Sequence, residues 1–106
     1  MVDAFTAAID ALFADPNIAR VAIWRPGGVG SGVAVRVTVR RPDQVVGFGD
    51  SRAILPTVLI DGRRSEVAEP ASGDTVEFDG DTFEIIAPPI ADSLRLVWVC
   101  EASLQG

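Results

Sequence analysis

"RPGGVGSGVAVRVTVRRP", residues 25–42, places four glycines directly before a run in which valine takes every second position. The valines at 33, 35, 37 and 39 fall on one side of an extended chain, and the residues between them, Ala34, Arg36, Thr38 and Arg40, fall on the other. A period of two with one apolar side is typical of a strand that buries one face. The pattern therefore predicts a β-strand over Val33–Arg40.

The glycines before this strand allow two interpretations. A dinucleotide-binding loop needs G-x-G-x-x-G between a strand and a helix, so that helical N–H groups point at the phosphate. Gly28 and Gly30 match the first two positions, but Val33 stands at the third, a strand follows, and no lysine completes a Walker loop. We therefore favour a flexible turn over a ligand site.

Working outward, the other segments predict one helix and a series of short strands. The helix covers residues 3–15, with Asp3 able to cap it and Asp15-Pro16 ending it. Its apolar face consists of Phe5, Ala8, Ile9, Leu12 and Phe13, and we expect Phe5, Ile9, Leu12 and Phe13 to dock the helix onto the barrel. The predicted strands are Arg20–Trp24, Val33–Arg40, Ile54–Asp61, Asp74–Phe78, Phe83–Ala87 and Leu94–Glu101. We expect a single mainly β domain over residues 1–106, a small antiparallel β-barrel or sandwich (residues 20–101) with one N-terminal α-helix.

The segment "TVEFDGDTFEII", residues 75–86, predicts a hairpin. We expect Phe78 to pair with Phe83 and Val76 with Ile85, with residues 79–82 as the connection. This register would place Glu77 opposite Glu84 on the outer face, a repulsion that a nearby arginine would relieve.

The terminal strand "LRLVWVC" is apolar on both sides. Leu94, Leu96, Trp98 and Cys100 share one face, and Val97 and Val99 share the other. Such a strand lies centrally in a sheet or meets a partner. We therefore expect Val97 and Val99 to form a partner contact during assembly.

Residues 41–53, "RPDQVVGFGDSRA", form a long loop that matches neither period. Val45, Val46 and Phe48 would be exposed there unless something covers them, which is unusual for a solvated loop. Either the loop folds back to plug one end of the barrel, or it is a contact segment that becomes ordered on assembly. We favour the second interpretation, with these three residues as partner contacts.

Composition limits the chemistry available to the chain. Its net charge is −6, from 15 acidic and 9 basic residues, which argues against tight binding to nucleic acid. It contains no histidine and no tyrosine, and one cysteine, so neither a disulfide within the chain nor a cysteine-built metal site is available. The apolar runs are too short to cross a bilayer, and residues 1–3 lack the basic residues of a signal peptide.

We expect no catalytic, cofactor or metal site. Asp74, Glu77, Asp79, Asp81 and Glu84 gather around one hairpin, but the spacing is too short for a calcium loop, and we favour a solvated acidic turn. The serines have no histidine to activate them. Cys100 is expected to be buried and inert. The sequence therefore indicates a protein that is not an enzyme.

Two longer stretches, "PTVLIDGRRSEVAEPASGDTVEFDGDTFEII" (56–86) and "DSLRLVWVCEA" (92–102), resemble the head-to-tail joining proteins of long-tailed phages. This is the family of the phage lambda joining protein, and the similarity is greatest to versions in prophages and gene transfer agents. "DALFADPNIARVAIWRP" (10–26) is also similar to the gene-transfer-agent members.

The resemblance implies a structural connector, or stopper, in the neck of a virion or gene transfer agent particle, made in the bacterial cytoplasm. It implies a ring of copies of this chain, expected to be hexameric, below a portal or adaptor. The ring would close the DNA exit and dock a tail terminator or tail tube. DNA would pass through the lumen without tight binding, and no membrane would be involved.

Two other functions stay open at this stage. One is a different neck protein, such as a tail terminator. The other is a small β-barrel module that binds a peptide or small ligand, which an apolar pocket with convergent polar groups would favour.

Overall fold

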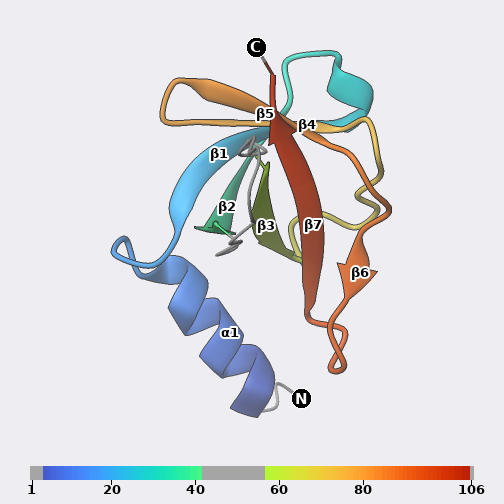
Figure 1. The fold of residues 1–106 in the computed structure, drawn as a ribbon. Helices are drawn as coiled ribbons and strands as arrows, with labels where there is room; N and C mark the ends of the chain where they lie inside the picture. Colours follow the sequence, from blue (N-terminus) through green and yellow to red (C-terminus); the bar gives the residue numbers. More distant parts are fainter. Residues whose placement is uncertain (1–3, 42–56, 106) are drawn as a thin grey trace, which may run out of the picture.

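The computed structural model describes residues 4–41 and 57–105, and within them the chain is mainly β (Figure 1). One helix, α1 (Ala4–Ala14), is followed by β1 (Arg20–Arg25), a short 3₁₀ turn η1 (Pro26–Gly28) and β2 (Val33–Arg40). Then come β3 (Thr57–Arg63), β4 (Thr75–Phe78), β5 (Asp81–Ile85), β6 (Ile90–Ala91) and β7 (Val97–Leu104). The predicted fold class, a small β-barrel with one N-terminal helix, is confirmed.

The strands form an antiparallel sheet that closes on itself. Their order is β3-β2-β1-β4-β5-β7-β6, and a further pairing between β3 and β7 closes six of them into a barrel. The two-residue β6 adds to the outside edge of β7. Thus β7 contacts β3 along one edge and both β5 and β6 along the other, which is the central position expected from its two apolar faces.

Apolar side chains from every barrel strand fill the interior. Val35 and Val37 are buried there and Val39 packs against the core, while Val33 lies at the end of β2 and is exposed. The largest fully buried side chains are Val37, Val58, Ile60, Val76, Ile85 and Cys100. The period-two pattern of residues 33–40 thus identified the inner face of β2, whose predicted bounds are also confirmed.

The β4–β5 hairpin differs from the predicted register by two residues. Val76 pairs with Phe83, and Phe78 pairs with Asp81, so the connection is the two-residue turn Asp79-Gly80. Both turn residues have positive φ, as an Asp-Gly turn of this kind requires. The four apolar side chains still share the inner face, because a shift of two preserves it, and the Phe78 and Phe83 rings stack with centroids 4.9 Å apart.

The end of the chain also differs from the prediction. The last strand begins at Val97, because residues 92–96 form a turn in which the Asp92 carboxylate accepts hydrogen bonds from the backbone N–H groups of Leu96 (2.8 Å) and Val97 (3.3 Å). The sequence did not predict β6. In contrast, β3 continues through Asp61 and Gly62 to Arg63, two residues beyond its expected end.

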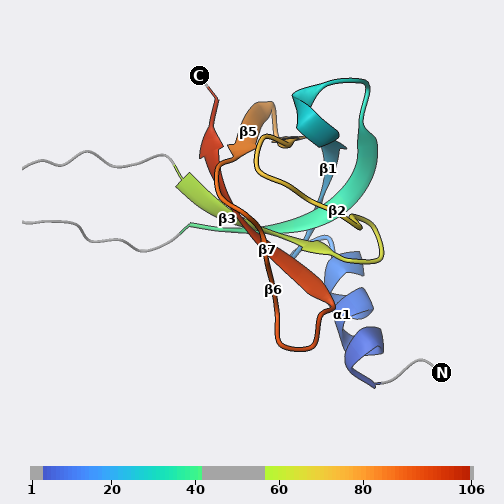
Figure 2. The same ribbon diagram turned by 90° about the vertical axis from the view of Figure 1, so that its right-hand side faces the viewer.

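The predicted helix is present, and its buried residue lies near its C-terminal end. Figures 1 and 2 show α1 extending away from the barrel, with its C-terminal end near β1 and β2. Phe13 is the one buried residue of α1, whereas Phe5 and Leu12 are exposed. The cap expected at Asp3 lies outside the described residues. No helix in the described part of the chain has the length and apolar character needed to span a membrane.

Candidate functional site

The outer face of the barrel carries α1 where β2, β3 and β7 lie side by side. A small apolar cluster, separate from the barrel core, joins the helix to this face. Phe13, Ala19 and Val97 are buried in it, and Ile9 and Leu96 pack against it. Val97 belongs to the face of β7 that points away from the barrel interior, so this contact explains why both faces of β7 are apolar.

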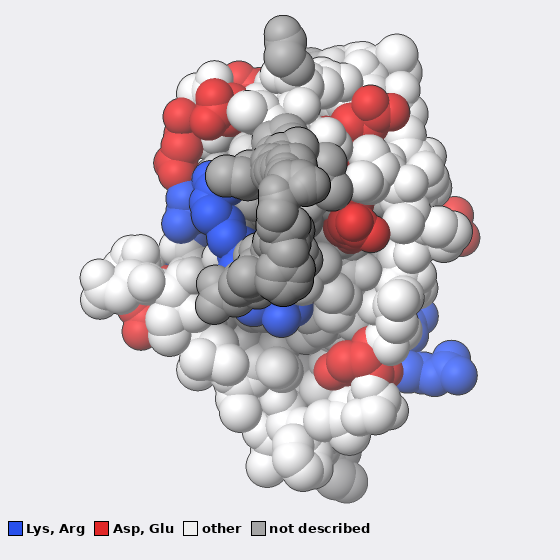
Figure 3. All heavy atoms as spheres, viewed as in Figure 1, with Lys and Arg blue, Asp and Glu red and all other residues white. Residues whose placement is uncertain are grey.

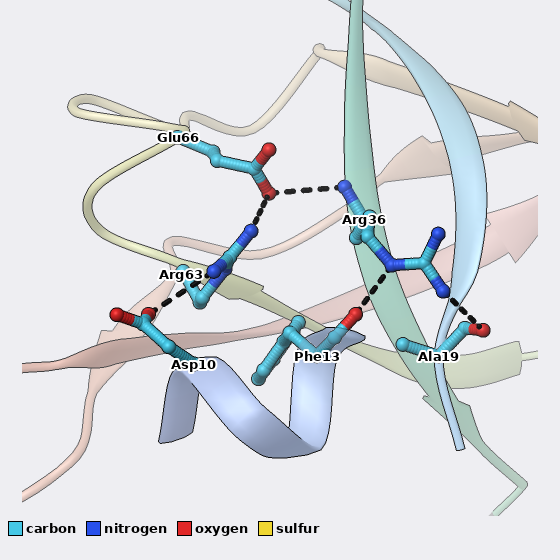
Figure 4. A network of polar contacts seen from close by, with 6 residues as sticks. All are labelled: Asp10, Phe13, Ala19, Arg36, Arg63 and Glu66. Atoms are coloured by element: carbon cyan, nitrogen blue, oxygen red, sulfur yellow. Dashed lines mark hydrogen bonds and ion pairs between the residues drawn. The ribbon is translucent and has the colours of Figure 1, made fainter. Parts of the chain in front are cut away.

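Polar contacts reinforce this attachment (Figure 4). Arg63 Nη1 donates to Asp10 Oδ1 of α1 (3.0 Å), and Arg63 Nη2 pairs with Glu66 Oε1 (2.9 Å). The Arg63 guanidinium also lies 5.3 Å from the centre of the Phe13 ring. Arg63 of β3 therefore holds the helix by an ion pair with Asp10 and by a cation–π contact with Phe13.

A second arginine binds the C-terminal end of α1. Arg36 of β2 donates from Nε to the carbonyl of Phe13 and from Nη2 to the carbonyl of Ala19 (3.2 Å), while its own backbone N–H donates to Glu66 Oε1 (3.0 Å). A cation at this position binds the Phe13 carbonyl in the last turn of the helix and complements the helix dipole. Asp10, Arg36, Arg63 and Glu66 together are called the anchor network below.

The charges of the anchor network affect the pKa of Arg63. Burial alone would lower the pKa of this guanidinium, but the hydrogen bonds and charges of Glu66 and Asp10 outweigh burial and raise its pKa. Arg63 therefore stays charged over the whole accessible pH range. The sequence did not identify this network, because its members come from four segments and look like ordinary outward-facing polar residues.

A groove of about 400 Å³ runs between α1 and the barrel. Its apolar walls include Leu12 and Ile18, with side chains 45% and 43% exposed, together with Ile9, Val39 and Val97. We call it the helix groove. Its polar residues are paired with one another, since Asp61 accepts hydrogen bonds from Arg40 Nη2 (2.9 Å), Arg40 Nε (3.1 Å) and Thr38 Oγ1 (3.0 Å). The helix groove thus presents an apolar surface without an unpaired charge.

The predicted partner-contact residues lie in different places. Val97 is 8% exposed, because α1 covers it, and Val99 is half-buried next to Asp61 on β3. Val97 also lines the helix groove, and contact of a partner with Val97 and with Val99 stays a prediction. Val45, Val46 and Phe48, with nearly all of the predicted 41–53 loop, lie outside the described residues.

A second cavity, of about 320 Å³, opens between the glycine turn and the segment after β3. Trp24, Val35 and Val67 form its apolar part, and Asp74 lies at its edge. Asp74 is 4% exposed, and its carboxylate accepts three hydrogen bonds, from Gly27 N (2.9 Å), Trp24 Nε1 (3.0 Å) and Ala71 N (3.0 Å). The prediction of a solvated turn is therefore wrong for Asp74, which holds three segments together.

The remaining carboxylates of the predicted acidic turn are more exposed. Glu77 pairs with Arg25 (2.8 Å), and Asp79 pairs with Arg20. Glu77 lies opposite Thr82 and not opposite Glu84, because the register differs from the predicted one. Over residues 4–41 and 57–105, no three histidine, cysteine or acidic side chains gather in a way that could hold a metal ion.

The glycine turn and Cys100 agree with their predictions. All four glycines of residues 25–32 have positive φ, and a strand follows them, so the segment is a turn. Cys100 is fully buried in the core, and desolvation, with smaller effects from the charges of Asp61 and Asp74, raises the pKa of its thiol to about 12. A thiol with this pKa stays protonated and unreactive at neutral pH.

Comparison with protein families decides the identity of the chain at family level. A family model described as "Phage Head-Tail Attachment protein" matches residues 1–102. The chain belongs to this family. No curated protein and no solved structure matches it.

Membership of the phage head-tail attachment family confirms the resemblance found in the sequence, at the level of the family. The family is structural, and membership supports a role as a neck or connector protein that contacts phage head and tail components. A connector protein acts through the surfaces by which it binds its partners. The helix groove and the exposed face of α1 are therefore the principal candidates for a partner-binding surface.

Proposed function

We propose that this chain is a stopper-type connector, a protein that forms a ring between the head and the tail of a phage or gene transfer agent particle. The ring would lie below the portal or its adaptor, close the DNA exit and receive the tail terminator or tail tube. The observation that carries this proposal is the family match over residues 1–102, nearly the whole chain.

The barrel supports a role in assembly. Its interior is filled by apolar side chains, so the groups available to a partner lie on the outside. The exposed large apolar residues include Phe5, Leu12 and Ile18 on and next to α1. Neighbouring apolar residues that are exposed, as these are at α1, are typical of a surface that becomes buried on assembly.

The charge of the chain supports passage of DNA without binding. A protein gains affinity for DNA mainly by neutralising phosphates with arginine and lysine, and this chain carries a net charge of −6. Figure 3 shows both acidic and basic side chains on the face in view. A ring of such subunits would repel DNA phosphates and would not retain the DNA.

The cavity beside Asp74 gives the alternative, a ligand-binding module, little support. Two of its carboxylates already have partners, because Asp74 accepts three hydrogen bonds and Glu66 pairs with Arg63 and the Arg36 backbone. These groups hold the protein together and do not converge on an empty volume.

The test is complementation of a deletion in the particle that encodes this chain. We expect particles without the protein to package DNA but to lose it or fail to join tails, which electron microscopy and nuclease protection would show. The purified protein should show no duplex affinity even at about 50 mM salt, where phosphate contacts are strongest. Normal tailed particles without the protein, or tight salt-sensitive DNA binding, would overturn the proposal.

A further inference from the structure

The apolar face of α1 is wider than the part that the barrel covers. At 100° per residue, Phe5, Ala8, Ile9, Leu12 and Phe13 form one continuous apolar arc around the helix. The barrel contacts only one edge of this arc, through Ile9 and Phe13. The other edge is exposed, with Phe5 at 61% and Leu12 at 45%.

Because α1 is short, its stability depends on how much of its apolar face is covered. The helix has 11 residues, and isolated helices of fewer than about 12–15 residues are marginal in water, so most of their stability comes from packing. The contacts of the anchor network and of Phe13 lie in the second half of α1. Additional cover over the first half would therefore stabilise the helix.

The helix groove offers a matching surface at the other end of the same helix. Its walls are apolar, and its charged groups, Arg40 and Asp61, are paired with each other. An occupant that carries an unpaired charge would be unfavourable there. An apolar, uncharged segment would fit without leaving a charge unsatisfied.

The first half of α1 has this character. Residues 4–9, "AFTAAI", contain no charged residue, although the chain as a whole has a net charge of −6. In Figure 3 the lower end of the molecule, where α1 lies, shows neither acidic nor basic side chains. Two copies of an acidic protein repel each other in general, and they approach with least repulsion through neutral surfaces such as these two.

We infer that the first half of α1 is an assembly arm, which places Phe5 in the helix groove of a second copy of this chain. Each copy then provides one arm and one groove, and when each arm enters the groove of the next copy the contact is heterologous and closes into a ring where the rotation between copies allows it. The inference rests on the proposed function, since it names the contact that would join the subunits of the ring.

The test uses disulfide cross-linking in assembled particles. The deletion is complemented with the double variant Phe5→Cys/Ile18→Cys, which places one thiol on the arm and one on the wall of the groove. Cys100 does not compete, because it is fully buried. The matched control is Val29→Cys/Ile18→Cys, since Val29 is 71% exposed and lies on the glycine turn instead of the arm.

After oxidation, we expect a denaturing gel without reductant to show a ladder of linked chains for the Phe5→Cys/Ile18→Cys particles and single chains for the control. Particles that contain the double variant but give no more linked chain than the control would overturn the inference. Such a result leaves the proposed function intact, because the protein is still present in the neck. Normal particles in the deletion alone would instead refute the proposed function.

A charge on the arm provides a second measurement. Phe5→Glu should reduce the number of copies per particle at least about tenfold, because docking would bury an unpaired carboxylate, whereas Val29→Glu should be incorporated as the wild type is. Circular dichroism of both purified variants checks that the barrel is folded. Incorporation of a folded Phe5→Glu protein at the wild-type level would contradict the inference.

Discussion

Replacement of Asp74 by asparagine should destabilise the protein more than any other single aspartate-to-asparagine change in the described residues. The carboxylate accepts hydrogen bonds from Gly27 N, Trp24 Nε1 and Ala71 N, at 2.9, 3.0 and 3.0 Å. An asparagine has one acceptor oxygen, so its NH₂ group must face at least one of these donors. Oδ2 accepts from both Trp24 Nε1 and Ala71 N, and Oδ1 accepts from Gly27 N, so an asparagine that keeps its oxygen at the Oδ2 position turns its NH₂ group toward the partly buried Gly27 N–H.

The magnitude follows from the number of donors affected. A buried donor without a partner costs about 1–3 kcal/mol, and the remaining hydrogen bonds weaken when the acceptor loses its charge, so we expect a loss of about 2–4 kcal/mol for Asp74→Asn. Asp74→Ala, which removes all three acceptor contacts, should cost about 3–6 kcal/mol. Both losses are a large part of the about 5–15 kcal/mol by which small domains are stable.

Urea unfolding followed by far-ultraviolet circular dichroism measures the effect. For a slope of about 1–1.5 kcal/mol per molar urea, the midpoint of Asp74→Asn should fall by about 2 M. The matched control is Asp79→Asn, because the Asp79 side chain is 63% exposed and forms a surface ion pair with Arg20, which contributes at most about 1 kcal/mol. If the two variants had midpoints within about 0.3 M of each other, the structural role assigned to Asp74 would be refuted.

Three further predictions concern the glycine turn, the buried thiol and the anchor network. Gly32→Ala should destabilise the protein by about 2–4 kcal/mol, because its φ is +80° and a new Cβ would lie 2.6 Å from a side-chain carbon of β1. Gly30→Ala is the control: its φ is +85°, but its Cβ would meet open space, so it should cost about 1 kcal/mol. Urea unfolding midpoints of the two variants measure the difference. Stability should fall by about 1 kcal/mol per pH unit between pH 9 and about 12, because the unfolded Cys100 thiol ionises near 9.0 while the folded one keeps its proton until about 12. Below pH 9 the thiol is protonated in both the folded and the unfolded state, so it does not affect stability there. Cys100→Ala should remove the fall in stability between pH 9 and about 12. If the fall persists in this variant, Cys100 is not its cause. Arg63→Gln should increase amide hydrogen exchange in α1 while the barrel strands keep their protection, because two ion pairs and a ring contact are lost. Arg20→Gln loses an ion pair with Asp79 and a contact with the Phe78 ring, neither of which involves α1, and should leave exchange in the helix unchanged.

Much of the fold follows from local patterns in the sequence. The alternation of valine in residues 33–40 identified β2 and its inner face, and Asp15-Pro16 marked the end of the helix. The hairpin register was missed, because apolar periodicity fixes the face of each strand but not the length of the turn. The Asp-Gly dipeptide, which favours a two-residue turn, was the stronger signal there.

The contacts that build the candidate site were harder to predict, because they depend on tertiary structure. Nothing in the local sequence shows that Arg63 meets Asp10, 53 residues away, or that Arg36 reaches the end of α1. The role of Asp74 had one local signal, its place in a turn directly before an apolar strand, where carboxylates often bind backbone N–H groups. The exposed edge of α1 was also missed, since an apolar helix face suggests full docking unless the position of the barrel is known.

Closure of the sheet determines how copies of this protein can associate. Because β3 pairs with β7 and completes the barrel, the six barrel strands have neighbours on both sides, and among the described residues only the two-residue β6 adds an edge of its own. Exposed strand edges are the usual starting point for uncontrolled growth of one sheet into the next. The closed barrel is therefore protected against such growth, and an association between copies of this chain would have to use contacts between side chains.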